Sequence, residues 1–265
     1  HTGSGGALTD SKSVPITVIP VNDVPSFTKG ADQTVLEDCG SQTVSTWATT
    51  ISAGPADESG QTVDFIVTNN NNLLFSTQPS ISPAGTLTYT PALNQNGLAT
   101  VTVQIHDNGG TANGGVDTSN PQTFTITVTA VNDAPTVTVP GSAVTTNEDT
   151  LVPVSGISVA DVDVDETASP GNTVQVTLSV SHGSLSLPTH TGLTFSVGDG
   201  TADGTMTFTG TLTDVDAALA TLSYLPDKDY NSNWGAESCS VTVSDLGHTG
   251  SGGALTDSKS VPITV

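Results

Sequence analysis

Apolar and polar residues alternate strictly along several segments of the chain. In residues 99–107 (ATVTVQIHD) and 123–131 (TFTITVTAV), apolar side chains, most of them β-branched, occupy every second position, and residues 174–180 and 239–245 follow the same rule. A period of two places these side chains on one face of a β-strand and leaves threonine on the opposite, solvated face. The pattern therefore predicts strands that each bury one face.

Turn signals separate these segments, among them Asn96-Gly97 and Asn108-Gly109. One stretch breaks the alternation: residues 213–222 (TDVDAALATL) place Asp214 at a plausible N-cap before alanine and leucine, which predicts a short helix or 3₁₀ turn. Short strands at regular spacing without a long helix are typical of an antiparallel β-sandwich. The expected fold class is all-β.

The chain repeats itself at two levels. Residues 1–18 (HTGSGGALTDSKSVPITV) return letter for letter at residues 248–265, a period of 248 − 1 = 247 residues. Within this period, each half contains a Tyr-x-Pro step, a strand ending in aspartate, a glycine-rich loop and a final strand, before an Asn-Asp-x-Pro link. We expect two related domains, residues 19–131 and 132–265, and interpret residues 1–18 as the last strand of a preceding copy of the second domain.

Three explanations of the duplicated segment remain open at this point. The chain is one window of a covalent tandem array, or separate chains exchange the duplicated strand, or the duplication is artificial. An isolated edge strand exposes unpaired backbone groups that native proteins avoid, which favours the presence of a neighbouring copy.

Composition narrows the range of partners. The formal charge is −22, from 26 acidic residues and 4 lysines, and arginine is absent. Nucleic acid and anionic membrane surfaces need clustered basic residues, so we expect neither, and divalent cations suit the excess carboxylate. No apolar run approaches the roughly 20 residues that span a bilayer. Cys39 and Cys239 are 200 residues apart, so we expect free or buried thiols or a bridge between neighbouring chains or copies.

The acidic residues gather in clusters. Alternation along an extended segment puts Asp161, Asp163 and Asp165 on the same side, where like charges repel unless water or a cation screens them. Carboxylate oxygens in such an arrangement suit Ca²⁺. From spacing alone, a solvated acidic loop is an equally good explanation.

Six motifs in this chain occur together in one known family. They are VNDVP (21–25) and VNDAP (131–135), NEDT (147–150), ISVADVD (157–163), LTYTP (87–91) and VTVSD (241–245). The sequence resembles the bacterial cadherin-like tandem repeats with VNDAP links that occur in giant surface proteins and RTX-adhesin-type extender regions. The resemblance spans nearly the whole chain and implies two tandem Greek-key sandwiches of the immunoglobulin/cadherin-like class, with Ca²⁺ between successive domains.

Carried over to matching positions, the resemblance implies two sets of calcium ligands. The junction inside the chain would use Glu37, Asn132, Asp133, Asp161, Asp163 and Asp245. The junction between copies would use Glu148 and Asp229 with Asn22, Asp23, Asp57, Glu58 and Asp107 of the next copy. The first domain has ADES where the second has DVD, and TPALNQNG lacks an acid that matches Asp229, so we expect the two junctions to differ.

The sequence offers no catalytic constellation. No H-x-x-x-H pair or G-x-S-x-G elbow is present, and we interpret Trp47 and Trp234 as core or strand-end packing. We therefore predict a non-enzymatic repeat of an extracellular, cell-surface fibre or adhesin stalk, stiffened by Ca²⁺. Its partners would be neighbouring copies of the same repeat, with lateral self-association as a further possibility. The alternatives are an adhesin module that binds a glycan or a protein, and a protomer that polymerises by strand exchange.

Overall fold

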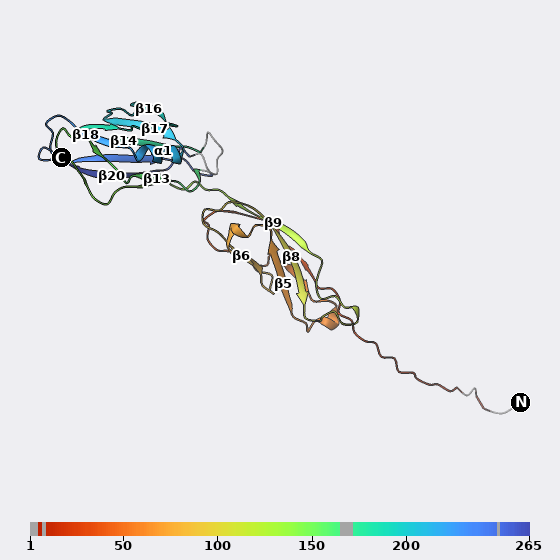
Figure 1. Ribbon diagram of the computed structural model, residues 1–265. Helices are drawn as coiled ribbons and strands as arrows, with labels where there is room; N and C mark the ends of the chain where they lie inside the picture. The colour runs from red at the N-terminus through yellow and green to blue at the C-terminus, as the bar shows by residue number, and fades with distance from the viewer. Residues whose placement is uncertain (1–4, 7–8, 165–171, 248–249) are drawn as a thin grey trace.

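The computed structural model describes residues 5–6, 9–164, 172–247 and 250–265. Its buried apolar side chains form two separate clusters, one between Phe27 and Val128 and the other between Val137 and Ile263. The two clusters lie in two bodies of strands that follow one another along the chain, and residues 9–25 run outward as extended chain (Figure 1). Two cores in sequence agree with two domains, although the boundaries at residues 19, 131 and 132 remain a prediction.

The first body contains three sheets, with strand orders β1-β4, β2-β9-β8-β5 and β3-β7-β6. The strands are β1 (Ser26–Thr28), β2 (Gln33–Leu36), β3 (Gln42–Val44), β4 (Thr49–Ser52), β5 (Val63–Asn69), β6 (Phe75–Ile81), β7 (Leu87–Pro91), β8 (Gly97–Asp107) and β9 (Gln122–Thr129). Three short 3₁₀ helices lie between them: η1 (Ala56–Glu58), η2 (Asn72–Leu74) and η3 (Ala112–Gly114). The sheets enclose a core that includes Leu87, Tyr89 and Ile105.

The second body has the same plan with one larger sheet. Its strand orders are β10-β13, β11-β20-β19-β14-β17-β16 and β12-β18-β15. The elements are β10 (Thr136–Thr138), β11 (Val144–Thr145), β12 (Val152–Pro153), β13 (Ser158–Ala160), β14 (Val174–Ser179), β15 (Gly183–Ser186), β16 (Thr194–Val197), β17 (Thr205–Gly210), α1 (Leu212–Leu219), β18 (Ser223–Pro226), β19 (Glu237–Ser244) and β20 (Thr256–Thr264). Within the described residues, no helix is long and apolar enough to cross a membrane.

The predicted alternation is confirmed in the long strands. Along β8 and β19, buried and partly exposed residues alternate from one position to the next, because successive side chains of a strand point to opposite faces. The all-β sandwich prediction is confirmed. The antiparallel sandwich that the sequence predicts also contains two parallel pairs, since β2 pairs with β9 and β11 pairs with β20 in parallel.

The predicted short helix is present as α1, but its cap differs from the prediction. Thr211, not Asp214, is the N-cap, and its side-chain oxygen accepts a hydrogen bond from the Asp214 amide at 3.2 Å. The Thr211 hydroxyl in turn donates to the Asp214 carboxylate at 2.8 Å. Asp214 therefore sits in the first turn, where its negative charge meets the positive end of the helix dipole.

The duplicated segment has two different environments. Strand β20 (Thr256–Thr264) pairs with β19 along eight residues and buries Val261 and Ile263 in the second core. Its sequence twin, residues 9–17, has no strand partner in the described structure, and Ile16 is 85% exposed where Ile263 is 4% exposed. The same sequence is thus a core strand in one place and an uncovered apolar segment in the other.

Candidate functional site: the two Asn-Asp links

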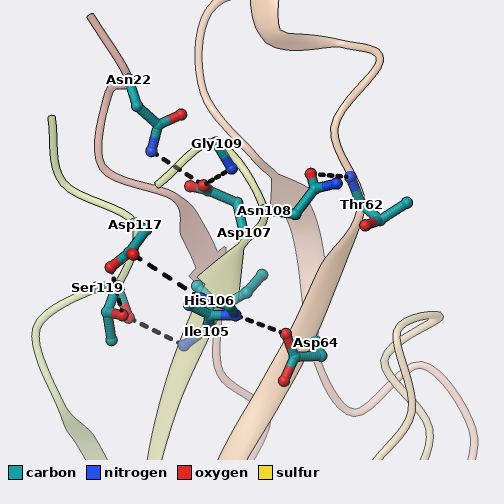
Figure 2. Close-up of polar contacts among 11 residues, drawn as sticks. Asn22, Thr62, Asp64, Ile105, His106, Asp107, Asn108, Gly109, Asp117 and Ser119 are labelled. Carbon is teal, nitrogen blue, oxygen red and sulfur yellow. Dashed lines mark hydrogen bonds and ion pairs between the residues drawn. The ribbon is translucent and has the colours of Figure 1, made fainter. Parts of the chain in front are cut away.

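We define the first link as residues 19–25 and the second link as residues 130–135. In the first link, Asn22 donates from its side-chain amide to Asp107 at the end of β8 (2.9 Å), and the amide of Gly109 donates to the same carboxylate oxygen (2.8 Å). Figure 2 shows Asn22 and Gly109 converging on Asp107. Asn22 also exchanges hydrogen bonds with the backbone of Val116. The link is thereby fastened to the loop that follows β8.

The second link repeats this arrangement. The Asn132 side-chain amide donates to Asp245, directly after β19, at 2.7 Å, and the Gly247 amide donates to the other oxygen of Asp245 at 2.8 Å. The backbone of Asn132 donates to the carbonyl of Ser251 in the loop that follows (3.2 Å). The structure therefore places Asn22 with Asp107 and Asn132 with Asp245 in equivalent positions.

The glycine-rich loops are shaped by this close approach. A Cβ atom on Gly109 would lie 1.8 Å from Oδ1 of Asn22, and one on Gly250 would lie 2.7 Å from the carbonyl carbon of Val131. Gly250 also has a φ of +67°, which side chains disfavour. The loops after β8 and β19 need glycine because the links pass directly against their backbone.

In each link, the backbone amide of the residue after the asparagine donates to a second carboxylate. The Asp23 amide donates to Oε1 of Glu58 at 2.8 Å, and the Asp133 amide donates to Oδ2 of Asp163 at 2.7 Å. The Asp163 amide in turn donates to Oδ1 of Asp161 (3.1 Å). Glu58 of ADES thus takes the place of Asp163 of DVD. Asp57 is exposed beside Glu58, and Asp165 lies outside the described residues.

The second link also contacts an acid from the preceding body. Glu37 follows β2, is 4% exposed, and accepts a hydrogen bond from the Val131 amide at 2.6 Å. Five other predicted residues are connected to this link through the hydrogen bonds above. We call the set the second-link cluster: Glu37, Asn132, Asp133, Asp161, Asp163 and Asp245.

The electrostatics of the second-link cluster are unfavourable to so many carboxylates. Burial and then the nearby charges of Asp163 and Asp38 raise the pKa of Asp133 above its ordinary value. Burial, Asp163 and Asp245 raise the pKa of Asp161 despite two backbone hydrogen bonds that lower it. Lysine forms ion pairs with Asp229 and Asp257 in the described residues, away from both of these carboxylates. Burial first, and then the neighbouring acids, therefore disfavour the charged forms of Asp133 and Asp161.

Several carboxylate oxygens point into buried space without a hydrogen-bond partner. They include Oδ2 of Asp107, Oε2 of Glu58 and Oδ2 of Asp161. A buried acceptor left unpaired costs about 1–3 kcal/mol. A cleft of about 290 Å³ lies beside the first link, between Asn22, Glu58, Gln61 and Gly109. Hard carboxylate and amide oxygens are the donor set that Ca²⁺ prefers, so the residues fit this ion by their chemistry.

The donors are nevertheless not assembled into a finished site. Within the part of the chain that the structure describes, no three His, Cys, Asp or Glu side chains are grouped so that they could hold a metal ion. Glu37, Glu58 and Asp163 are turned toward backbone amides of the links. Asp107 and Asp245 instead accept from the side-chain amides of Asn22 and Asn132 and from loop amides. Side-chain rotation would be needed to gather the oxygens around one point.

Two of the predicted residues lie far from both links. Glu148 and Asp229 are exposed at the other end of the second body. The Asp229 amide donates to Asp149 at 3.1 Å, just as the Asn94 amide donates to Asp38 at 3.0 Å in the first body. Asn94 therefore stands where the second body has Asp229. The Glu37 amide donates to the carbonyl of Thr129 just after the β2-β9 pair, and the Thr146 amide donates to that of Thr264 just after the β11-β20 pair. Thr146 is therefore the residue of the second body that corresponds to Glu37, and Glu148 lies two residues further along the chain.

The sequence interpretation missed Asp38, Asp149 and Gln61. Asp38 and Asp149 share a positive φ of 57°, a conformation that aspartate tolerates in turns. Each directly follows a predicted ligand, Glu37 or Glu148, and this position was the available signal in the sequence. Gln61 donates to Oδ1 of Asn22 at 2.7 Å, and nothing in its sequence context pointed to that contact. This contact engages the amide oxygen of Asn22 in the first link.

A histidine lies close to the first link. His106 on β8 contacts Asp64 of β5 through Nδ1 at 2.7 Å, and its Nε2 lies 3.9 Å from Asp117 (Figure 2). The hydrogen bond to Asp64 and the neighbouring acids raise the pKa of His106 above its ordinary value. His106 thus bridges β5 and the segment that leads out of the glycine-rich loop.

No protein-family model matches the chain, and no curated protein matches its sequence. Among solved structures, it is similar to the cadherin domains 1–4 of protocadherin gamma B7 (15% identity, TM-score 0.40, covering 92% of this chain and 51% of that one). It is similar also to mouse cadherin-23 EC22-24, with 17% identity and a TM-score of 0.41, covering 93% of this chain and 66% of that one. Domains 4 and 5 of the S-layer protein SbsC are similar with 14% identity and a TM-score of 0.26, covering 76% of this chain and 70% of that one. The chain spans about half the length of the protocadherin fragment.

Proposed function

We propose that this chain is a repeating structural segment of a long extracellular bacterial surface fibre or adhesin stalk, and that Ca²⁺ stiffens its links. The observation that carries the proposal is the recurrence of one arrangement at both links. An asparagine side chain donates to a strand-end aspartate, and the backbone amide of the next residue donates to a second carboxylate. An array needs a joint of the same kind between each pair of successive domains, and the two links share this arrangement.

Calcium would remove the electrostatic penalty of the links. The second-link cluster would hold the ion inside the chain, and Asn22, Asp23, Asp57, Glu58 and Asp107 would supply oxygens at the first link. Glu148 and Asp229 would complete that site from the preceding copy. A divalent cation among these oxygens replaces repulsion by attraction, so each joint would lose bending freedom. Sites of this kind work outside cells, where millimolar calcium is available.

The 247-residue repeat supports the array itself. Residues 9–17 are identical to β20, a core strand of the second body. The simplest source of residues 1–18 is the last strand of a preceding second domain, so that the domains would be residues 19–131 and 132–265. The partners of the chain are then further copies of itself.

Calorimetric titration with CaCl₂ tests the calcium part of the proposal. We expect saturable binding that is weakened at least about tenfold, roughly 1.4 kcal/mol, by the isosteric double variant Asp161→Asn/Asp163→Asn. Asp10→Asn/Asp227→Asn removes the same charge at exposed positions outside the cluster and should bind calcium like the parent chain. Equal affinity in all three proteins would contradict the proposal, because binding would then reflect overall charge.

Strand exchange between separate chains is the second candidate, and the exposed apolar face of residues 9–17 favours it. The two candidates differ in the covalent mass of the native polymer. A covalent array gives a polypeptide far larger than the 26.6 kDa of this chain in denaturant. A strand-exchanged polymer falls apart in denaturant to units of that mass.

A further inference from the structure

Trp234 has an unusual environment for so large an apolar side chain. It lies in the loop between β18 and β19 and is 72% exposed, whereas Trp47 is buried in the first core. The expectation that Trp234 packs in the core or at a strand end is therefore wrong for the chain as described. Tryptophan carries one of the largest apolar surfaces of any residue, and interfaces are enriched in it.

The loop that carries Trp234 is fastened to the last residue of the repeat. The Ser232 amide donates to the carbonyl of Val265 at 3.1 Å, and the Val265 amide donates to the Ser232 hydroxyl at 2.9 Å. The Trp234 amide donates to Asn231 at 3.0 Å, which closes the loop into a turn. Because consecutive Cα atoms are about 3.8 Å apart, a residue following Val265 would lie within reach of this turn.

The repeat shows which residues follow Val265 in an array. Val265 corresponds to Val18, and Val18 is followed by Ile19, Pro20 and Val21. Ile19 is 65% exposed in this chain and Val21 is also exposed. Three apolar residues in succession would thus leave the second body beside an exposed tryptophan.

The joint inside the chain has neither a counterpart of the Ile19-Pro20 step nor a loop as long as the one that carries Trp234. Thr129 is separated from Asn132 by two residues, whereas Thr17 is separated from Asn22 by four, and the additional pair includes the Ile-Pro step. The matching loop is also shorter there: two residues separate Asn94 from Gly97, the first residue of β8, whereas seven separate Asp229 from Glu237, the first residue of β19. The longer loop and the longer link occur at the same joint.

We propose that Trp234 packs against Ile19 and Pro20 of the following copy, forming an apolar contact between copies. The inference rests on the proposed array and adds to it a joint-specific interface. Successive joints of the fibre then differ: the joint inside each copy depends on carboxylates alone, and the joint between copies also has a hydrophobic contact.

A chain in which Val265 is followed directly by residues 19–131 of a second copy tests the contact. The readout is acrylamide quenching of Trp234, assigned in each protein by its loss in Trp234→Phe. We expect the quenching of Trp234 to fall by at least about half relative to the 265-residue chain, because the ring becomes covered. Both copies of Trp47 are buried and contribute little quenching.

Two variants of the extended chain make the result specific. Ile19→Ser in the following copy only should restore the quenching of Trp234, and this exposed position does not endanger folding. Leu93→Ser, at an exposed position of the corresponding loop in the first body, should leave the quenching low. Unchanged quenching on extension, or low quenching that survives Ile19→Ser, would overturn the contact. Neither outcome bears on calcium binding or on the covalent mass of the polymer, so failure of the array is detected separately.

Discussion

At the scale of single residues, the links are defined by carboxylates whose charge is disfavoured. The pKa values of Asp133 and Asp161 are raised above the ordinary aspartate range by burial and by neighbouring acids. A raised folded-state pKa means that the folded chain binds protons more readily than the unfolded chain. In the absence of metal, these two groups destabilise the fold above their folded pKa, and this penalty is relieved as the pH falls through it.

Calcium should reverse this pH dependence. The ion binds the ionised carboxylates, so the increase in melting temperature on adding calcium should be largest near pH 7 and should shrink as the pH falls toward 4. Differential scanning calorimetry with calcium and with chelator across that range measures it. An increase that is independent of pH would show that these carboxylates do not ligate the ion.

His106 gives a second prediction, with the same sign as the metal-free effect of Asp133 and Asp161, because its pKa is also raised in the folded state. Its pKa is raised in the folded state, first by the hydrogen bond to Asp64, so its contribution to stability is fully present below the unfolded pKa of about 6.5. That contribution is lost as the pH rises through the folded value. Asp64→Asn should lower the pKa of His106 in an NMR titration, and Asp117→Asn, at 3.9 Å, should lower it less. Equal shifts in the two variants would contradict the assignment to the Asp64 contact.

At the scale of elements, alternation was sufficient to predict the long strands but not their partners. Strands β8, β9, β14 and β19 lie where period-two segments were expected, because burial of one face is a local property of the sequence. The parallel pairs β2-β9 and β11-β20 are not local, since their strands are about a hundred residues apart. Trp234 was misplaced for a related reason: in the contact proposed above, its partners belong to the following copy.

The candidate site was predictable in part. The Asn-Asp-x-Pro motif and the strand-end aspartates identified Asn22 with Asp107 and Asn132 with Asp245, and the structure brings these pairs together. Gln61 could not be found in the same way, because a glutamine three residues after Glu58 has no distinctive pattern. Its role follows only from the hydrogen bond to Asn22.

The duplicated segment provides a matched pair of substitutions. Ile263→Ala removes a buried side chain of β20 and should lower the free energy of unfolding of the second body by about 2–5 kcal/mol. Ile16→Ala changes the same residue in the same local sequence, but at an exposed site, and should alter it by no more than about 0.5 kcal/mol. Urea unfolding measures both. Comparable losses would mean that residues 9–17 are packed in the isolated chain.

At the scale of the whole molecule, the charge of −22 and the carboxylates gathered at the two links lead us to expect that the shape of the chain depends on its counterions. Without a divalent cation, repulsion within the second-link cluster should let the two bodies swing about residues 130–135. With the cation, the same oxygens would hold the bodies in one orientation. The proposed fibre would then be flexible or stiff according to the calcium concentration around it.

Small-angle X-ray scattering of the 265-residue chain during a calcium titration, followed by chelator, tests this account most directly. We expect the maximum dimension to increase and the distribution of shapes to narrow on adding calcium, and both changes to reverse with chelator. The response should be lost in Asp161→Asn/Asp163→Asn and retained in Asp10→Asn/Asp227→Asn. A scattering curve that is the same with calcium and with chelator would contradict calcium-dependent stiffening, and the rigidity of the fibre would then have to come from direct packing between its domains.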